Sequence, residues 1–457
     1  MTNVNRTFAV LSTGAGVIAL LQSLIGPVLP TVQHELHTSQ NTATWVLTAY
    51  LLSASVCTPI LGRIGDMLGK TKTLLAVQVV LALGLLLAAL APSIQVLITA
   101  RVIQGAGGAV FPLAFGILRD ELRAADLRKA VGTLAAIVAA GSGLGVVLAG
   151  PVVATLGVRW LFWIPLAVTI ATTLAAWRWV PPSPVRTPGR VNWAATALLS
   201  GWLVALLLAV SQAPAWGWTS PGVLTLLALS AVGIAAWTTV ELRSSNPLID
   251  MRMLRLPAVW PTNTVALLFG AAMFATWAFL PQLIQSPTGF AASPTEAGLL
   301  MLPMLVTMFL AGILSGRLPL SPRTQLAAAA GLSTIANAAL ALAHTQRWEL
   351  ATSSAILGLA IGLAFASMTT LVVQAVPPTQ TGAASGTNAN LRTMGGSIGA
   401  AVMSSIVTTA PGNTGYTNGF TMFAVVSLAA VGAALLVPTH RRQTKLAQAP
   451  TAEPALT

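Results

Sequence analysis

The sequence predicts an all-α membrane protein with about 14 transmembrane helices, arranged as two six-helix bundles with two extra central helices. Of its 457 residues, 55% are hydrophobic and only 7% are charged, and the mean hydropathy is +0.80. A water-soluble domain of this size does not carry such a balance. The lipid bilayer is therefore the expected solvent, and a helix needs about 20 apolar residues to cross its core.

Apolar stretches of that length follow one another along the chain, separated by short polar or Pro- and Gly-rich segments. Pro27 is expected to unwind the first of them near its outer end. We expect the spans at 8–28, 45–61, 73–91, 94–118, 131–154, 161–180, 193–210, 223–240, 259–280, 297–314, 326–343, 350–373, 383–407 and 420–437.

The positions of the basic residues predict the orientation. If the N-terminus is cytoplasmic, all but four of the 23 Lys and Arg residues fall on the cytoplasmic side, as the positive-inside rule requires. Of the exceptions, Arg159 and Arg347 lie outside, and Arg101 and Arg392 lie within spans. We therefore expect both termini in the cytoplasm. The net charge of +13 has this topological cause, and no nucleic-acid partner is expected.

Two basic linkers divide the chain. We expect an N-terminal six-helix bundle at 1–180, a linker with two additional transmembrane helices at 181–257, a C-terminal six-helix bundle at 258–437, and a disordered cytoplasmic tail at 438–457. Gly-Arg follows both the second and the tenth span, a weak internal echo of repeated halves.

Signals of enzymatic chemistry are missing from the sequence. The ten acidic residues fall at loops, span edges and the tail, and no paired carboxylates, HExxH motif or Cys/His metal cluster occurs. We expect no catalytic residues, no metal and no bound cofactor. A membrane-embedded enzyme or a non-transporting sensor remains a remote alternative.

The loop after the second span, GRIGDMLGK, resembles a signature of the major facilitator superfamily. The matching residues are Gly62, Asp66, Gly69 and Lys70, with Arg63 beside them. We expect Asp66 and the neighbouring basic side chains to form a charge cluster that locks two helix ends together and works as a cytoplasmic gate. The alternative is an ordinary basic loop.

RVIQGAGGA in the fourth span resembles the second signature of that superfamily. An arginine within a membrane is costly and normally faces a polar cavity or a partner. Arg101, with Gln104 one turn further on, is therefore a candidate for function or coupling; the alternative is a tether to a backbone carbonyl. Gly105 is expected to allow close helix packing.

The fifth span resembles a degraded copy of the antiporter signature, with Gly141, Gly145 and Gly150 at matching spacing. These glycines suit a hinge, but they also suit plain helix packing. Further matches, together with the two extra central spans, are similar to the fourteen-span drug:proton antiporter family. This resemblance implies a multi-pass protein of the bacterial inner (plasma) membrane that expels antibiotics, drugs or a secondary metabolite.

The first span departs from that family, because Leu21 stands where an acidic residue is usual. Proton coupling needs a group that changes protonation, usually a membrane carboxylate. Glu296, at the outer edge of the tenth span, is the only substitute that the sequence suggests. Gln22 and Arg392 complete the set of intramembrane polar candidates.

We expect alternating-access export of small amphiphilic compounds, with the proton gradient as the energy source and the monomer as the functional unit in the bilayer. A cavity with arginines and no acid favours neutral or anionic compounds. An uncoupled facilitator or a metabolite importer is the alternative. Candidate cavity residues share polarity or aromatic character within spans: Ser23, Asn263, Trp277, Gln282, Asn337 and Asn388.

Overall fold

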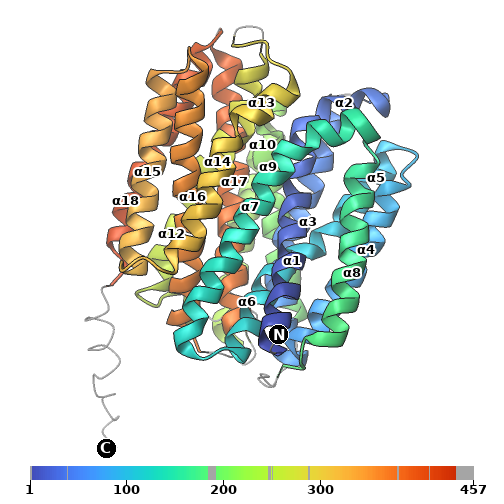
Figure 1. Cartoon of the computed structure of the whole chain (residues 1–457), viewed down its shortest axis with the longest axis vertical. Coiled ribbons are helices and arrows are strands. Elements are labelled where there is room, and N and C mark those ends of the chain that lie inside the picture. The colour runs from blue at the N-terminus through green and yellow to red at the C-terminus, as the bar shows by residue number, and fades with distance from the viewer. Residues whose placement is uncertain are drawn as a thin grey trace, which may run out of the picture.

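The computed structural model describes residues 3–38, 40–183, 192–244, 247, 249, 251–286, 289–377, 380–410 and 412–438. Within these ranges the chain is helical, and the helices lie side by side along the long axis of the molecule (Figure 1). Most of the expected tail at 438–457 and the linker segment 184–191 fall outside the described residues.

The first half runs through ten helical elements. They are α1 (Asn3–Leu24), η1 (Gly26–Val28), α2 (Leu29–Glu35), α3 (Gln40–Leu68), α4 (Lys70–Ala89), α5 (Ile94–Gln104), η2 (Gly105–Ala109), α6 (Val110–Glu121), α7 (Ala124–Leu156) and α8 (Trp160–Trp179). The remaining helices are α9 (Trp193–Trp216), α10 (Pro221–Arg243), α11 (Met251–Leu254), α12 (Val259–Gln285), α13 (Pro294–Leu300), α14 (Leu302–Ser315), α15 (Pro322–Leu342), α16 (Arg347–Ala375), α17 (Thr381–Thr409) and α18 (Thr414–Leu435).

The number of spans agrees with the sequence prediction. Among the described residues, 13 helical segments are long and apolar enough to cross a membrane. The remaining predicted span corresponds to α17, a helix of 29 residues whose first half is rich in Thr, Ser and Asn. Because α17 packs against α3, α6, α12 and α18, its polar first half is surrounded by protein.

Among the described residues three spans are interrupted, one of them at Met301 between α13 and α14, and the sequence predicts only the interruption in the first span. Pro27 lies in η1, which separates α1 from α2 and confirms the expected break. The fourth span is also divided, by the 3-10 segment η2 (Gly105–Ala109). A Cβ on Gly105 would lie 2.5 Å from the Cβ of Ser53, and a Cβ on Gly108 would lie 2.6 Å from Thr58 Oγ1. The glycines therefore let η2 approach α3 closely.

The two halves meet along several helices. α7 packs against α14, α3 and α6 pack against α17, and α9 contacts both α3 and α17. One apolar cluster crosses the boundary and includes Leu134 of α7, Met308 of α14 and Ile361 of α16, all of them buried. α10 packs mainly on α9 and exposes Leu229 and Val232, as expected of a helix at the lipid boundary.

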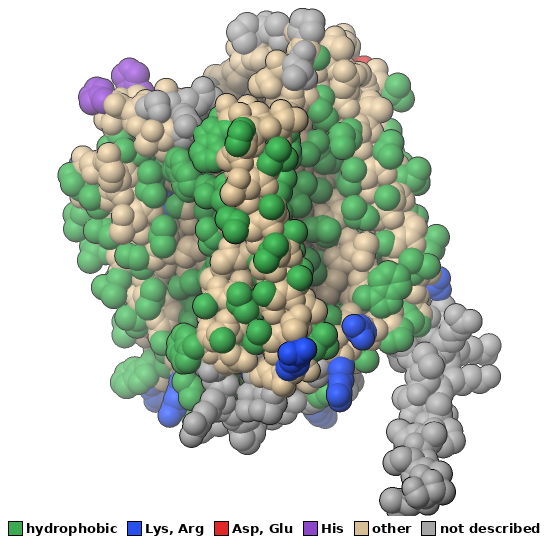
Figure 2. All heavy atoms as spheres, turned by 180° about the vertical axis from the view of Figure 1, so that it is seen from behind, with side chains coloured by type: hydrophobic (Ala, Val, Ile, Leu, Met, Phe, Trp, Pro, Cys, Tyr) green, Lys and Arg blue, Asp and Glu red, His purple; other side chains and the backbone are tan. Residues whose placement is uncertain are grey.

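Basic side chains gather at one end of the molecule, and hydrophobic side chains cover its middle (Figure 2). We call this end the basic end. It holds the start of α1, the connection from α3 to α4, and the C-terminal ends of α6, α8 and α10 (Figure 1). The grouping follows the charge pattern of the sequence, because alternate connections between antiparallel spans return to the same end.

Candidate functional site

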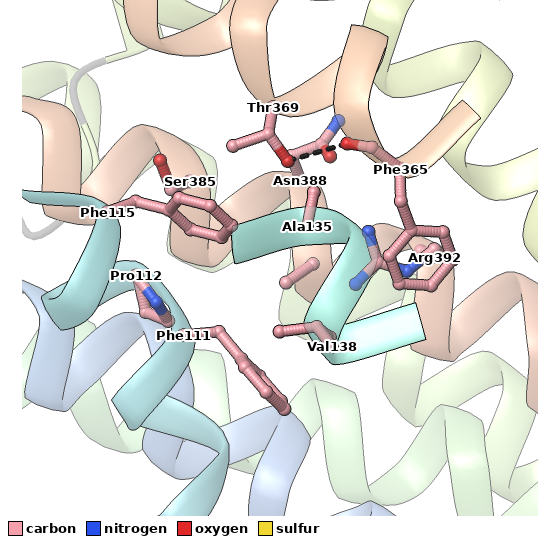
Figure 3. Close-up of a pocket in the computed structure, with 11 residues that line it drawn as sticks. Phe111, Pro112, Phe115, Ala135, Val138, Phe365, Thr369, Ser385, Asn388 and Arg392 are labelled. Carbon is pink, nitrogen blue, oxygen red and sulfur yellow. Dashed lines mark hydrogen bonds between the residues drawn. The ribbon is translucent and has the colours of Figure 1, made fainter. Parts of the chain in front are cut away.

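A cavity lies between the two halves of the protein, and four helices contribute to it. α6 and α7 belong to the first half, and α16 and α17 belong to the second. The cavity is small in this structure, with a volume of about 20 Å³ open to a sphere the size of a water molecule. The lining residues are Phe111, Pro112, Phe115, Ala135, Val138, Phe365, Thr369, Ser385, Asn388, Ala389 and Arg392 (Figure 3).

The chemistry of this cavity is aromatic and cationic. The guanidinium of Arg392 lies 4.1 Å from the ring centroid of Phe365, a cation–π arrangement. Phe111 and Phe115 lie on the α6 side of the cavity (Figure 3). No Asp or Glu is among the 11 lining residues. The cavity therefore offers a positive charge and apolar rings to a ligand, and it offers no carboxylate.

Asn388 is anchored from behind by a second asparagine. Its Nδ2 donates a hydrogen bond of 2.9 Å to Oδ1 of Asn263 on α12, and both side chains are buried. Of the predicted cavity residues, Asn388 lines this cavity, and so does Arg392 from the coupling candidates. Asn263 does not line it, but it holds a side chain that does.

Arg119, at the end of α6, joins the two halves at the basic end. Its Nη1 donates to the carbonyl of Val373 and to Oγ1 of Thr381, each at 2.6 Å, and its Nη2 donates to the carbonyl of Val376 at 2.7 Å. The last carbonyls of a helix lack intrahelical partners and carry partial negative charge. One guanidinium thus closes the C-terminus of α16 and fastens the start of α17.

Asp66 makes the complementary contact from α3. Its Oδ2 accepts a hydrogen bond of 3.3 Å from the backbone N–H of Ala383, in the first turn of α17. A carboxylate is stabilised at a helix N-terminus because the free N–H groups carry partial positive charge. We use the name Arg119 lock for two sets of contacts: those of Arg119 with Val373, Val376 and Thr381, and that of Asp66 with Ala383.

The Arg119 lock lies directly next to the cavity on the basic side. On α6, Arg119 follows the cavity residue Phe115 by four residues; on α16, Val373 follows Thr369 by four. On α17, Thr381 precedes Ser385 by four. Residues four apart share a helix face about one turn apart. The lock therefore separates the cavity from the basic end.

Within the predicted charge cluster around Asp66, Lys70 pairs with a different acidic residue. Lys70 Nζ instead forms an ion pair of 2.8 Å with Asp120 of α6, and the two side chains are 1% and 2% exposed. Asp66 turns to α17, because the positive end of that helix is available there. α6 continues past Leu118, the approximate end expected for the fourth span, to Glu121, and it places the side chain of Asp120 inside the protein.

Glycines at the turn from α3 to α4 and on α6 make the arrangement around Lys70 possible. Gly69 has φ +106°, a value that favours glycine, at the turn from α3 to α4. Gly62 lies buried within α3, and Arg63 beside it is half-buried. On α6, Gly116 leaves room for the stem of Lys70, since a Cβ there would meet Lys70 Cδ at 2.7 Å.

Arg101 is fully buried and cross-links spans of the first half. Its Nε donates to the carbonyl of Val46 at 3.0 Å, its Nη1 donates to Gln104 Oε1 at 2.8 Å, and its guanidinium lies 4.3 Å from the ring centroid of Tyr50. Gln22 Nε2 donates to the hydroxyl of Tyr50 at 2.9 Å.

Gln104 extends the same network. Its Nε2 donates to the carbonyl of Gly84 on α4 at 2.9 Å, so α1, α3, α4 and α5 are tied together by side chains. The tether to a backbone carbonyl that the sequence left open for Arg101 is present. Because neither Arg101 nor Gln104 lines the cavity, this network stands apart from it.

The glycines of α7 mark its contact with α1. A Cβ on Gly141 would collide with the backbone of Gly16, and a Cβ on Gly145 would collide with the backbone of Leu20. Gly150 is half-buried further along α7. Close packing of α1 against α7 therefore depends on two of the three predicted glycines.

Glu296 lies at the start of α13, away from the cavity. Its carboxylate accepts from the backbone N–H of Ser293 in a capping box, and it forms a 3.2 Å ion pair with Arg347. The side chain is 44% exposed. These contacts give Glu296 a capping task, and its coupling task stays a prediction.

The other predicted cavity residues lie elsewhere in the protein. Asn337 is buried among α12 and α15, where its Oδ1 accepts from Thr276 Oγ1 at 2.7 Å. Ser23 donates to the carbonyl of Ala19 in its own helix. Trp277 is buried on α12, and Gln282 is exposed there. None of the four lines the cavity.

Sequence reasoning missed the residues that make the lock and the aromatic wall. Arg119 and Asp120 look like loop charges, although an Arg-Asp pair directly after an apolar helix is a usable signal for a buried ion pair. Phe111, Phe115 and Phe365 carry no such signal, because aromatic residues in membrane helices are common in plain packing.

Two helical halves with a cavity between them and a lock at one end are typical of a polytopic membrane transporter. The family model described as Major Facilitator Superfamily matches residues 11–400 and 264–456. The chain belongs to this superfamily and is therefore a multi-pass transporter of the plasma membrane, which acts on small molecules rather than as an enzyme.

Curated relatives include proteins named for antibiotic resistance, export and multidrug transport. The tetracenomycin C resistance and export protein of Streptomyces glaucescens is 28% identical, over 87% of this chain and 74% of the relative. The methylenomycin A resistance protein of Streptomyces coelicolor is 28% identical, over 93% and 89%. The multidrug transporter protein MdtP of Bacillus subtilis is 26% identical, over 86% and 74%.

A solved structure confirms the fold. The crystal structure of the human organic anion transporter MFSD10 (TETRAN) superposes with a TM-score of 0.73 at 17% identity, covering 95% of this chain and 100% of that one.

Proposed function

We propose that the protein exports small neutral or anionic amphiphiles by alternating access, using the proton gradient. The observation that carries this proposal is the cavity between the halves, with Arg392 beside Phe365 and no carboxylate in its lining. A buried cation over an aromatic ring favours a ligand that brings an anion and apolar surface. The export named for the Streptomyces glaucescens relative supports the direction, and the resistance and multidrug transport named for the other two agree with it.

In this proposal the bundles at 1–180 and 258–437 are the moving halves, and the central helices at 181–257 accompany them. The basic end faces the cytoplasm, so both termini are cytoplasmic, and the monomer is the transporting unit. Opening the Arg119 lock exposes the cavity to the cytoplasm for loading. Closing it leaves the opposite side as the exit.

The proton step is assigned to a carboxylate of the basic end. Asp66 and Asp120 are both buried, whereas Glu296 is exposed and paired with Arg347. Protonation of Asp66 would remove the charge that attracts the N-terminus of α17 and would weaken the lock. Asp66 is therefore the better candidate for coupling, although the sequence favoured Glu296.

The test is efflux of an antibiotic panel from a pump-deficient bacterial host, with and without a protonophore. The proposal expects wild type to confer resistance that the protonophore abolishes, and it expects Asp66→Asn to abolish resistance as well. Efflux against a gradient that persists without the proton gradient would contradict coupling and favour an uncoupled facilitator. Active efflux by Glu296→Gln would remove Glu296 from the mechanism.

A further inference from the structure

A second hollow lies outside the transport cavity, on the surface between α3 and α4 at the basic end. Its walls come from the last turns of α3 and the first three turns of α4, and Ala106 of η2 also contributes. The empty volume is about 1020 Å³, including the open side. The residues that carry the argument are Ile64, Met67, Leu68, Lys72, Ala76 and Val80. We call this hollow the α3–α4 groove.

The groove exists because small side chains stand where larger ones would fill the space. Ala76 and Ala106 contribute one methyl group each, between longer side chains such as Ile64 and Val80. Leu68 is 61% exposed and Val80 is 39% exposed, so the apolar walls open outward. Within a membrane span, an outward apolar hollow is filled by lipid rather than by water.

Lys72 places one positive charge at the basic end of this apolar groove. It stands in the first turn of α4 and is exposed, whereas its neighbour Lys70 is buried and neutralised by Asp120. The groove lining contains no carboxylate. Lys72 therefore offers a positive charge that no acidic residue of the groove lining balances. It lies at the level where the helices leave the hydrocarbon core of the membrane.

We propose that the α3–α4 groove binds one anionic phospholipid of the leaflet at the basic end. One acyl chain lies along Ile64, Ala76 and Val80, and the headgroup phosphate meets Lys72. An apolar trough with a cation at its interfacial end matches the two parts of such a lipid. Because the groove borders the α3–α4 turn, a bound lipid also packs against Met67 and Leu68, next to Asp66.

The detergent-purified full chain, mixed with phosphatidylglycerol or with phosphatidylcholine, tests this site by native mass spectrometry. We expect wild type to retain phosphatidylglycerol preferentially. Lys72→Ala should weaken that retention about fivefold, as expected for one basic residue against an anionic lipid, and Lys72→Arg should restore it. The matched control Lys129→Ala removes an exposed lysine of the basic end outside the groove and should change nothing.

A second variant tests the apolar part. Ala76→Trp fills the groove without touching the charge and should lower retention of both lipids. Equal retention of the two lipids by wild type, or wild-type retention by Lys72→Ala, would overturn the charged end of the proposal. Unchanged retention by a folded Ala76→Trp would overturn the groove as the site. The readout is independent of transport, so failure of the export proposal would not affect it.

Discussion

Arg119 Nη2 and the carbonyl oxygen of Val376 lie 2.7 Å apart, although 257 residues separate them in the chain. This contact fastens the end of α6 to the end of α16 and closes the basic side of the cavity. Two of the three acceptors of Arg119 are backbone carbonyls and the third is the hydroxyl of Thr381, so its contacts depend on the positions of helix ends and not on a matching acidic side chain. A lock of this kind releases when the helix moves.

Replacing Arg119 should open the basic side. Arg119→Ala removes three hydrogen bonds to the second half, so we expect the cavity to become accessible from that side and transport to fall at least tenfold. Maleimide labelling of Ser385→Cys in a Cys57→Ser background measures the opening, with several-fold faster labelling expected from the basic side.

Arg123→Ala is the matched control for that experiment. Arg123 is 90% exposed and pairs with Asp126 of its own segment. Its loss should leave both labelling and transport near wild type. Equal labelling rates in wild type and Arg119→Ala would show that Arg119 does not close the cavity.

The ion pair of Lys70 and Asp120 should matter for stability. Lys70→Met leaves a buried carboxylate without its partner, so we expect a loss of about 3–5 kcal/mol in the free energy of unfolding. The double variant Lys70→Met with Asp120→Leu should recover much of it, because no charge remains buried. Thermal unfolding in detergent reports both.

The exposed pair of Arg347 and Glu296 provides the comparison. Its side chains are 60% and 44% exposed, so Arg347→Ala should cost less than about 1 kcal/mol. If Lys70→Met and Arg347→Ala lowered the free energy of unfolding by similar amounts, water would have to reach the pair of Lys70 and Asp120 between α4 and α6.

Even a conservative substitution of Arg101 should impair the protein. Its planar fork donates from Nε and from Nη1 in different directions while lying over Tyr50, and a lysine cannot reproduce all three contacts. We expect Arg101→Lys to lower both transport and thermal stability. Tyr50→Phe retains the ring and loses only the bond from Gln22, so its effect should be much smaller. Transport assays and thermal unfolding of the same preparations measure both effects. A fully active and stable Arg101→Lys variant would show that the three contacts of Arg101 are not needed together.

Gly141 should not tolerate even a methyl group. A Cβ there collides with the backbone of Gly16, so Gly141→Ala should destabilise the protein by about 1–3 kcal/mol through overpacking. Gly331 has nothing within 4 Å of its Cβ position. Gly331→Ala in α15 should therefore be neutral or stabilising by up to about 1 kcal/mol. Equal melting temperatures of the two variants would contradict the tight contact between α1 and α7.

The sequence predicts spans well because each span is a local property. Runs of apolar residues and the positions of Lys and Arg depend on the bilayer alone, and Pro27 breaks its helix by its own geometry. The pairing of charges is not local. Basic residues lie within a few positions of Asp66 in the sequence. In the folded protein, however, Asp66 accepts a hydrogen bond from the N–H of Ala383 on α17, which is 317 residues away in the chain.

The cavity was predicted only in part for a related reason. Asn388 and Arg392 stand out because polar residues are rare in spans, and both line the cavity. Asn337 is an equally conspicuous polar residue within a span, but its Oδ1 accepts a hydrogen bond from Thr276 inside the second half of the protein. Polarity marks a residue that needs a partner; only the packing of the helices decides whether that partner is a neighbour or a ligand.

In the proposed mechanism, Arg392 provides the positive charge of the transport cavity. The most direct measurement is uptake into inside-out vesicles of a lipophilic aromatic carboxylate and of its neutral methyl ester, by wild type, Arg392→Lys and Arg392→Ala. One lost charge-assisted contact corresponds to a factor of about 10–100. We expect uptake of the carboxylate to fall by about this factor in Arg392→Ala and to recover in part in Arg392→Lys, while uptake of the ester stays at the wild-type level. Equal uptake of the carboxylate by wild type and Arg392→Ala, or an equal loss for both compounds, would contradict this role of Arg392.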